Sequence, residues 1–346
     1  MSAESHYLDA IEAEENDDYD AALEHARLAV KADPEHSNAW WMIVALLSPD
    51  GKYPDIEQAS KALVACTKVV EIDPSRVDAW VKGGRIMVDH LGLYEDALHW
   101  WQNCREAAPL ESVPIVEQTT ILSDLGMYAE ARDRLGSLFE ENLDIANSQL
   151  ARITHLHKTL ERSAQQDPAN HFKPWKQNHG GWTSIKMRSN KAPVSENMLF
   201  MMTTVPFLMM EVFVSRALFS GFGEWGSFCL TSVLILVTVL FGMSFTRKLY
   251  QRVNKPGFNL LRAIQFEASS GKIVIPEEIR SSKLYMFLFS RHPPAFQQRL
   301  EKIIISDKRL PKNWKMNLPD FDSHLDEIGF IEDEEGETEL SSYEEE

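Results

Sequence analysis

The sequence contains the stretches MLFMMTTVPFLMMEVFVSRALF, residues 198–219, and GSFCLTSVLILVTVLFGMSF, residues 226–245. These apolar stretches are 22 and 20 residues long. As helices that rise about 1.5 Å per residue, each would extend roughly 30 Å, the thickness of the hydrocarbon core of a bilayer. Because lipid cannot satisfy backbone N–H and C=O groups, each must form a helix. The short connection predicts an antiparallel transmembrane hairpin over residues 197–246.

Basic residues flank this hairpin on both sides. Five Lys and Arg lie between His171 and Glu196, and five more lie between Arg247 and Arg262, whereas the connecting loop carries only Glu224. The positive-inside rule therefore predicts an integral membrane protein with two spans and both termini in the cytoplasm. The acidic first residues lack the pattern of a signal peptide. The alternative is a pair of helices buried in a soluble domain, which the length of the stretches and their basic flanks disfavour.

The first apolar stretch contains two ionisable residues, Glu211 and Arg216, and an interrupting Pro206. Ionisable groups at membrane depth are costly and often have a function. Arg216 is close enough to the loop for its side chain to reach the interface. Glu211 lies about one turn deeper, so an intramembrane pair with Arg216 or a shallow carboxylate is equally compatible with the sequence. An interfacial anchor is the simpler interpretation of both residues.

The charge of the chain is concentrated at one end. The net charge is −17 over 346 residues, but residues 318–346 hold 13 acidic residues and no Lys or Arg. Without them the net charge is −4. We expect this range to be a disordered acidic tail. The basic clusters lie next to the membrane, where anionic lipid is their natural counter-charge, so nucleic acid is not an expected partner.

Three segments of the N-terminal half are similar to one another. They are NDDYDAALEHARLAVKADPEHSNAW (16–40), SKALVACTKVVEIDPSRVDAW (60–80) and LGLYEDALHWWQNCREAAP (91–109). Small residues allow helices to cross closely, and Pro ends one helix before the next turn. These segments resemble tetratricopeptide repeats. By this resemblance, an aromatic residue fills the space between repeats, Ala lies where helices cross, and Pro ends the unit. These positions are held by Tyr19, Ala22, Ala29 and Pro34 in the first unit and by Tyr94, Ala97 and Pro109 in the third.

The resemblance implies a stack of helix pairs, because one pair alone cannot bury its apolar face. The predicted fold is therefore all-α, with a tetratricopeptide-like helical solenoid, the transmembrane hairpin, a small mainly helical C-terminal segment and the acidic tail. The expected boundaries are a solenoid at 1–165 (units 3–36, 37–76, 77–111 and 112–142, and a capping helix at 146–165), a basic linker at 166–196, the hairpin at 197–246 and a cytosolic segment at 247–317.

The same resemblance implies a concave groove, lined by the first helix of each pair, that holds a peptide or a partner helix. The groove positions would be Tyr7 and Ile11 in the first unit, Trp41 and Ala45 in the second, and Val81 and Arg85 in the third. Of the adjacent Trp40 and Trp41, one should pack between helices and the other face the groove, or both belong to the core. The family's carboxylate clamp is broken, since the matching positions hold Tyr7, Ile11, Met42, Asp78 and Lys82.

After the hairpin, residues 258–268, 277–289 and 294–306 are predicted to form short helices. This C-terminal segment also shows a fainter resemblance. LFSRHPPAFQQRLEKI, residues 288–303, is similar to an element of HtpX-type membrane zinc metallopeptidases, in which it also follows a transmembrane hairpin. Those enzymes need two His one helical turn apart with a Glu between them. No His here has another His four residues later, and Glu267 is a lone carboxylate. Kinship would imply a non-catalytic relative, and without it His-Pro-Pro is simply the start of a helix.

These patterns predict a membrane-anchored protein that mediates protein–protein interaction as an adaptor or scaffold. Catalytic constellations are absent, including a phosphate-binding glycine loop and a nucleophile elbow. Gly83 and Gly84 are interpreted instead as small residues at a helix crossing. We expect no enzymatic activity, cofactor, bound metal or small-molecule substrate. The alternative is a regulatory, catalytically degenerate relative of the membrane zinc metallopeptidases.

Overall fold

The computed structural model describes residues 2–323, apart from 142, 144 and 312, and omits the side chain of Arg216. The described residues form helices and no strand, so the prediction of an all-α chain is confirmed. One isolated bridge, between Ile273 and Arg309, is the nearest approach to sheet structure among them. The chain divides into two compact units. One comprises residues 1–177, 262–275 and 289–346, and the other comprises residues 178–261 and 276–288.

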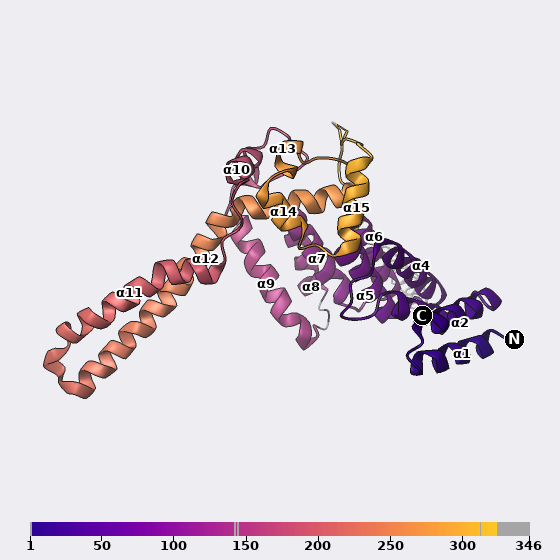
Figure 1. Ribbon diagram of the computed structural model, residues 1–346, viewed down its shortest axis with the longest axis horizontal. Coiled ribbons are helices and arrows are strands. Elements are labelled where there is room, and N and C mark those ends of the chain that lie inside the picture. The colour runs from indigo at the N-terminus through magenta and orange to yellow at the C-terminus, as the bar shows by residue number, and fades with distance from the viewer. Residues whose placement is uncertain (1, 142, 144, 312, 324–346) are drawn as a thin grey trace, which may run out of the picture. The chain divides into compact units, whose positions relative to one another are not determined.

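The first unit begins with nine consecutive helices, which we call the helical array (Figure 1). Each helix packs against the next one in the chain. The bounds are α1 Ala3–Glu15, α2 Tyr19–Ala32, α3 Ser37–Leu47, α4 Ile56–Ile72, α5 Val77–Arg85 with the π-helical turn η1 Ile86–Leu91, α6 Tyr94–Ala107, α7 Val113–Leu125, α8 Tyr128–Glu140 and α9 Asn147–Ala164.

Local chemistry explains where these helices begin. The side chain of Ser2 accepts a hydrogen bond from the backbone N–H of Ser5, and Asp18 accepts one from Ala21. Asp55 and Gln58 form a capping box at the start of α4. Such caps satisfy N–H groups that have no partner inside the helix.

Two tryptophans show a repeated arrangement at the starts of α3 and α5. The indole N–H of Trp40 donates to the carbonyl of Pro34, and that of Trp80 donates to the carbonyl of Pro74, both over 2.9 Å. Each bond joins residues six apart, across the turn between one helix pair and the next. The same Asp-Pro turn is therefore held by the same contact in two successive pairs.

Small residues allow close helix crossings, as the sequence indicated. Ala22, Ala29 and Ala97 are fully buried. A Cβ atom built on Gly83 would lie 2.4 Å from the ring of Trp100, and one on Gly84 would lie 2.3 Å from the ring of Trp101. The interpretation of this glycine pair as a packing feature is confirmed. Tyr19 differs from the expected buried aromatic, since it is 52% exposed and its hydroxyl donates to Asp17.

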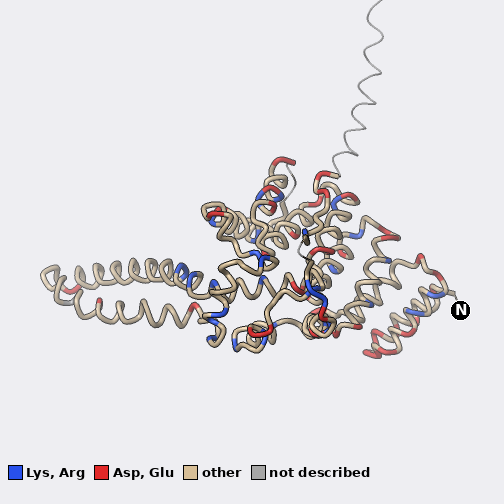
Figure 2. The backbone as a smooth tube through the Cα atoms, turned by 90° about the horizontal axis from the view of Figure 1, so that it is seen from above, with Lys and Arg blue, Asp and Glu red and all other residues tan. Residues whose placement is uncertain are grey.

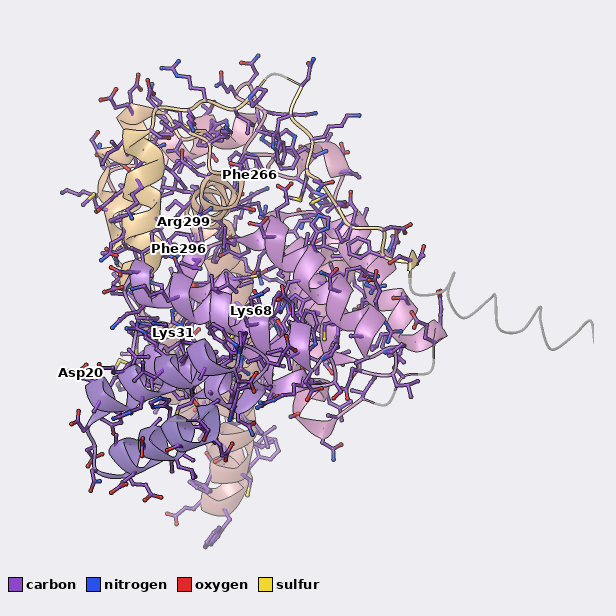
Figure 3. All side chains as sticks on the ribbon, turned by 90° about the vertical axis from the view of Figure 1, so that its right-hand side faces the viewer. Asp20, Lys31, Lys68, Phe266, Phe296 and Arg299 are labelled. Carbon is purple, nitrogen blue, oxygen red and sulfur yellow. The ribbon has the colours of Figure 1, made fainter. Side chains whose placement is uncertain are left out.

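The C-terminal part of the first unit packs on the helical array. Helix α15 (Pro294–Ile305) contacts α4 and η1. The guanidinium of Arg299 donates to the carbonyl of Ala268 at 2.9 Å, which joins α15 to the end of α12 (Figure 3). Helix α15 begins at the second Pro of the His-Pro-Pro sequence, as a Pro in the first helical turn predicts. A short 3-10 helix, η2 (Pro168–Asn170), follows α9.

The second unit contains α10 (Gly180–Arg188), α11 (Glu196–Leu218), the 3-10 turn η3 (Ser220–Phe222), most of α12 (Gly223–Ser270), α13 (Glu277–Arg280) and α14 (Lys283–Phe289). The expected separate helix over 258–268 is wrong, because α12 continues without a break through Pro256 to Ser270. The expected helix over 277–289 is two helices. Residues 247–317 are divided between the two units.

Candidate functional site

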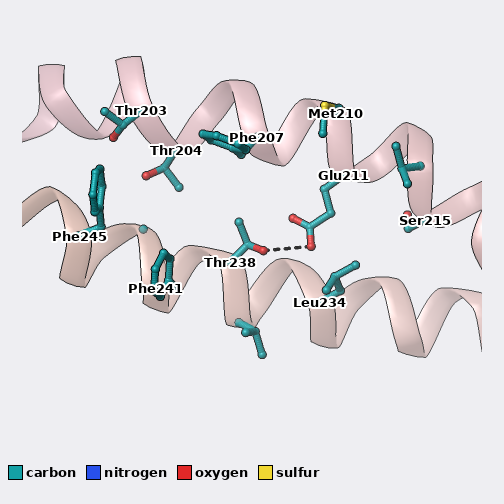
Figure 4. A pocket seen from close by; sticks show the side chains of 13 residues that line it. Thr203, Thr204, Phe207, Met210, Glu211, Ser215, Leu234, Thr238, Phe241 and Phe245 are labelled. Carbon is teal, nitrogen blue, oxygen red and sulfur yellow. Dashed lines mark hydrogen bonds between the residues drawn. The ribbon is translucent and has the colours of Figure 1, made fainter.

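Helices α11 and α12 lie antiparallel (Figures 1 and 4). Thr203 and Thr246 bring their hydroxyl oxygens to 3.4 Å, and Thr238 donates to the Glu211 carboxylate at 3.0 Å. At the end away from the connecting turn, next to Thr246, Arg247 pairs with Glu196 at 3.4 Å. The earlier a residue lies in α11, the later its partner lies in α12, which is the expected order for an antiparallel hairpin.

The outward sides of the hairpin are apolar. Both helices are long and apolar enough to cross a membrane. Only 17% of the first apolar stretch and 6% of the second is buried within the protein, unlike core helices. Phe213, Trp225 and Phe241 are 80%, 83% and 72% exposed. Figure 2 shows few charges along the two helices and Lys and Arg where they join the rest of the chain. An exposed apolar surface of this extent is typical of a membrane-facing one.

A cavity of about 580 Å³ lies between the two helices. Apolar side chains form most of its wall, and Figure 4 shows Glu211 projecting into it beside Thr238. One carboxylate oxygen of Glu211 accepts the Thr238 hydrogen bond, and the other is buried without a hydrogen-bond partner among the described residues. The structure therefore pairs Glu211 with a hydroxyl group of α12. The site combines a mostly apolar wall with one carboxylate and several hydroxyl groups.

The predicted groove residues lie on the first helix of three successive pairs: Tyr7 and Ile11 on α1, Trp41 and Ala45 on α3, and Val81 and Arg85 on α5. Ala45 and Arg85 are exposed, and the other four are half-buried.

Neighbouring helices contribute a second side chain at two of these positions. The ring of Tyr7 lies 4.9 Å from that of His36, and the guanidinium of Arg76 lies 4.8 Å from the ring of Trp41. Trp41 thus presents an aromatic face next to a cation.

Two of the residues at the clamp positions are paired within the array. Asp78 accepts from the guanidinium of Arg76 at 2.9 Å, which lowers the pKa of its carboxyl. Lys82 donates to Asp50 at 2.8 Å. Asp78 and Lys82 are therefore engaged with other residues of the array. They do not form the clamp of Lys and Asn side chains that would bind a terminal carboxylate.

A buried polar cluster lies on α6, α7 and α8, and sequence reasoning missed it. The guanidinium of Arg134 donates to Gln118 at 2.7 Å and to the carbonyl of Phe321 at 3.2 Å. Arg105, which is 1% exposed, pairs with Glu141. Burial, with a smaller contribution from the nearby Arg105, lowers the pKa of Arg134 to about 10. A single sequence shows these residues only as polar positions among apolar ones.

The same cluster corrects the boundary of the acidic tail. Residues 318–323 were expected to be disordered, but Phe321 lies over the guanidinium of Arg134 and Ser323 accepts a hydrogen bond from Gln102 at 2.9 Å. The buried side chains of Gln102 and Arg134 thus find hydrogen-bond acceptors in this segment, which favours an ordered chain here. The remaining acidic residues, 324–346, lie outside the described residues.

His292 of the His-Pro-Pro sequence, the lone carboxylate Glu267 and His179 of the linker make structural contacts. The ring of His292 stacks on Phe296 with 4.1 Å between centroids. Glu267 is fully buried, and its carboxylate accepts hydrogen bonds from the backbone N–H groups of Val274 and Ile275 at 2.8 and 3.4 Å. His179 caps α10 by accepting from the N–H of Gly181. Each of these side chains has a packing or capping role in the fold.

Burial lowers the pKa of His292 to about 4 from its ordinary value of 6.5. The unfolded chain therefore binds a proton that the folded chain does not at pH values between these two, so this contribution to stability falls as the pH decreases from 6.5 toward 4. Between pH 7.5 and pH 5 we expect a loss of about 2 kcal/mol. Thermal unfolding followed by circular dichroism at the two pH values measures it. In His292→Phe, which keeps the ring stack, this part of the pH dependence should disappear, and an unchanged dependence would contradict the assignment.

No protein-family model matches this chain, and no curated protein is significantly similar to it in sequence.

Proposed function

We propose that this protein is a membrane-anchored binding protein, in which the hairpin fixes the chain in the bilayer and the helical array binds a protein or peptide. The observation that carries the proposal is the outward apolar surface of α11 and α12, which water would not tolerate over this length. The repeat-like sequence of the array supports the binding role, because arrays of this kind provide surfaces for protein recognition.

The charge pattern favours an orientation with both termini on the cytoplasmic side. Cys66 and Cys104 are fully buried, and burial raises the pKa of each thiol to about 12, so neither should react with a maleimide. With Cys229→Ser as background, Gly221→Cys in the loop should react with an impermeant maleimide added outside intact cells. Ser2→Cys should react only after the membrane is opened. The reverse pattern would overturn the orientation.

The proposed contact surface is formed by the half-buried Trp41 and the exposed Ala45 and Arg85 on α3 and α5. Aromatic and arginine side chains often provide most of the binding energy at interfaces, and truncating one commonly costs about 2 kcal/mol or more. That loss corresponds to a roughly 30-fold weaker complex.

Affinity capture with the full chain from detergent-solubilised membranes tests this surface. Trp41→Ala and Arg85→Ala should each lose proteins that the unaltered chain retains, whereas Arg132→Ala, an exposed change on α8, should retain them. Circular dichroism confirms that each variant is folded. Equal retention by all four proteins would remove this face of the array as the binding surface.

A further inference from the structure

Three potential metal ligands meet on the first helix pair. His6 and Asp9 are three residues apart and share one side of α1, and His25 comes from α2. Helices α1 and α2 approach closely because the residues between them are small: Ala10, Ala22 and Ala26 are all fully buried. The close crossing brings the two imidazoles and the carboxylate to the same side of the pair.

The distances place the three groups around one point. One potential ligand atom from each residue lies within 4.8 Å of those from the other two. Nδ1 of His25 is 4.0 Å from a carboxylate oxygen of Asp9, and the rings of His6 and His25 are stacked with 6.5 Å between centroids. All three residues are half-buried, so a small ion could reach them from solvent.

The two imidazoles have unused nitrogen atoms. Nδ1 of His6 and Nδ1 of His25 are both buried without a hydrogen-bond partner among the described residues. His36, which caps α3, is a useful contrast: its Nδ1 accepts from the N–H of Ala39, and its Nε2 lies 3.2 Å from Glu4. Buried polar atoms normally have partners, so two unsatisfied imidazole nitrogens, one of them 4.0 Å from a carboxylate oxygen, need an explanation.

We propose that His6, Asp9 and His25 bind a divalent transition-metal ion of the zinc type. Two imidazoles and one carboxylate suit Zn²⁺ better than Ca²⁺ or Mg²⁺, which prefer oxygen ligands. Ligands about 2.0 Å from a tetrahedral ion lie about 3.3 Å apart, so the side chains need to close by roughly 1.5 Å. Half-exposed side chains can rotate by this amount. Three protein ligands leave a fourth position for water.

The local charge favours a cation. Residues 1–36 contain eleven Asp and Glu against two Lys and Arg. This excess of negative charge would attract a divalent ion and compensate part of the cost of removing its water shell. The ion would also link α1 to α2, and binding to the folded state alone would stabilise the pair.

Calorimetric titration of the full chain in detergent with Zn²⁺ alone tests the proposal, after bound metals are removed with a chelator. One Zn²⁺ per chain is expected. His6→Ala and His25→Ala should each weaken binding by at least about tenfold, since the loss even of an outer hydrogen-bond partner commonly has that effect. Asp9→Asn, which keeps the shape of the side chain, should weaken it in the same direction. His157→Ala, on the exposed side of α9, is the matched control and should leave it unchanged.

The visible absorption of bound Co²⁺ gives a second measurement, because tetrahedral His and carboxylate coordination has intense bands that octahedral water lacks. Absence of Zn²⁺ binding, or binding that survives the double change His6→Ala with His25→Ala, would overturn the proposal. So would binding abolished by His292→Ala instead, which would favour a peptidase-like metal site. Should an alanine variant lose its helical circular dichroism, Asp9→Asn decides the outcome. The result is independent of the capture experiment with Trp41→Ala.

Discussion

Replacing Glu267 by Ala should lower the stability of the first unit by about 3 to 5 kcal/mol. The carboxylate is fully buried and holds the backbone N–H groups of Val274 and Ile275, which are themselves buried. Its removal leaves two donors without this acceptor, each at a cost of about 1 to 3 kcal/mol, and also leaves a cavity. Thermal unfolding by circular dichroism should show a midpoint lower by roughly 5 to 15 °C.

Glu267→Gln is the matched control for this change. Its side-chain carbonyl keeps an acceptor of nearly the same size at the same place, so its loss of stability should be less than half of that of Glu267→Ala. Equal losses in the two variants would show that the negative charge, rather than the acceptor geometry, stabilises the turn over residues 271–275. A negligible loss in both would contradict the anchoring role.

Gly92→Ala should destabilise the protein by about 2 to 5 kcal/mol. Gly92 ends η1 with a φ of +66°, a conformation that costs an L-residue about 1 to 2 kcal/mol. An added Cβ would also lie 2.4 Å from the ring of Phe296 and 2.8 Å from the Cβ of Ala268, both fully buried. Such overpacking costs about 1 to 3 kcal/mol more. The midpoint of thermal unfolding measures the sum.

The two contributions can be separated with Gly51→Ala. Gly51 has a φ of +78°, but a Cβ there would meet no atom within 4 Å. This variant should lose only the conformational part, about 1 to 2 kcal/mol. If Gly51→Ala and Gly92→Ala lose the same stability, the contact between η1 and α15 at Gly92 is not tight, and the packing argument is wrong.

Local patterns predicted the helical content and the apolar hairpin well, because both depend on neighbours along the chain. Spacing of apolar residues, Asp-Pro turns and capping side chains act within one or two helical turns. The end of α12 was harder to predict. Residues 258–268 were expected to form a separate helix, yet α12 continues through Pro256 to Ser270, since Pro removes only one intrahelical hydrogen bond.

In the candidate sites too, local sequence predicted some residues and the packing of helices decided others. The groove residues follow from the repeat pattern, and their role in binding stays a prediction. Glu211 was recognised as an unusual residue, but its partner Thr238 comes from the other helix and has no mark in the sequence. The group of His6, Asp9 and His25 was missed because a search for two His one turn apart covers a single helix. The spacing of His6 and Asp9 was the only local signal.

The sequence by itself determined that this chain is helical, that two of its stretches are long and apolar enough to cross a membrane, and that small residues recur where helices cross. Each of these depends on composition or on periodicity within one segment. Only the tertiary structure decided that Phe321 lies over Arg134, that Glu267 anchors a backbone turn and that two histidines lie close to one carboxylate. These contacts join residues from different helices or turns, and the distance between such residues depends on how whole helices pack.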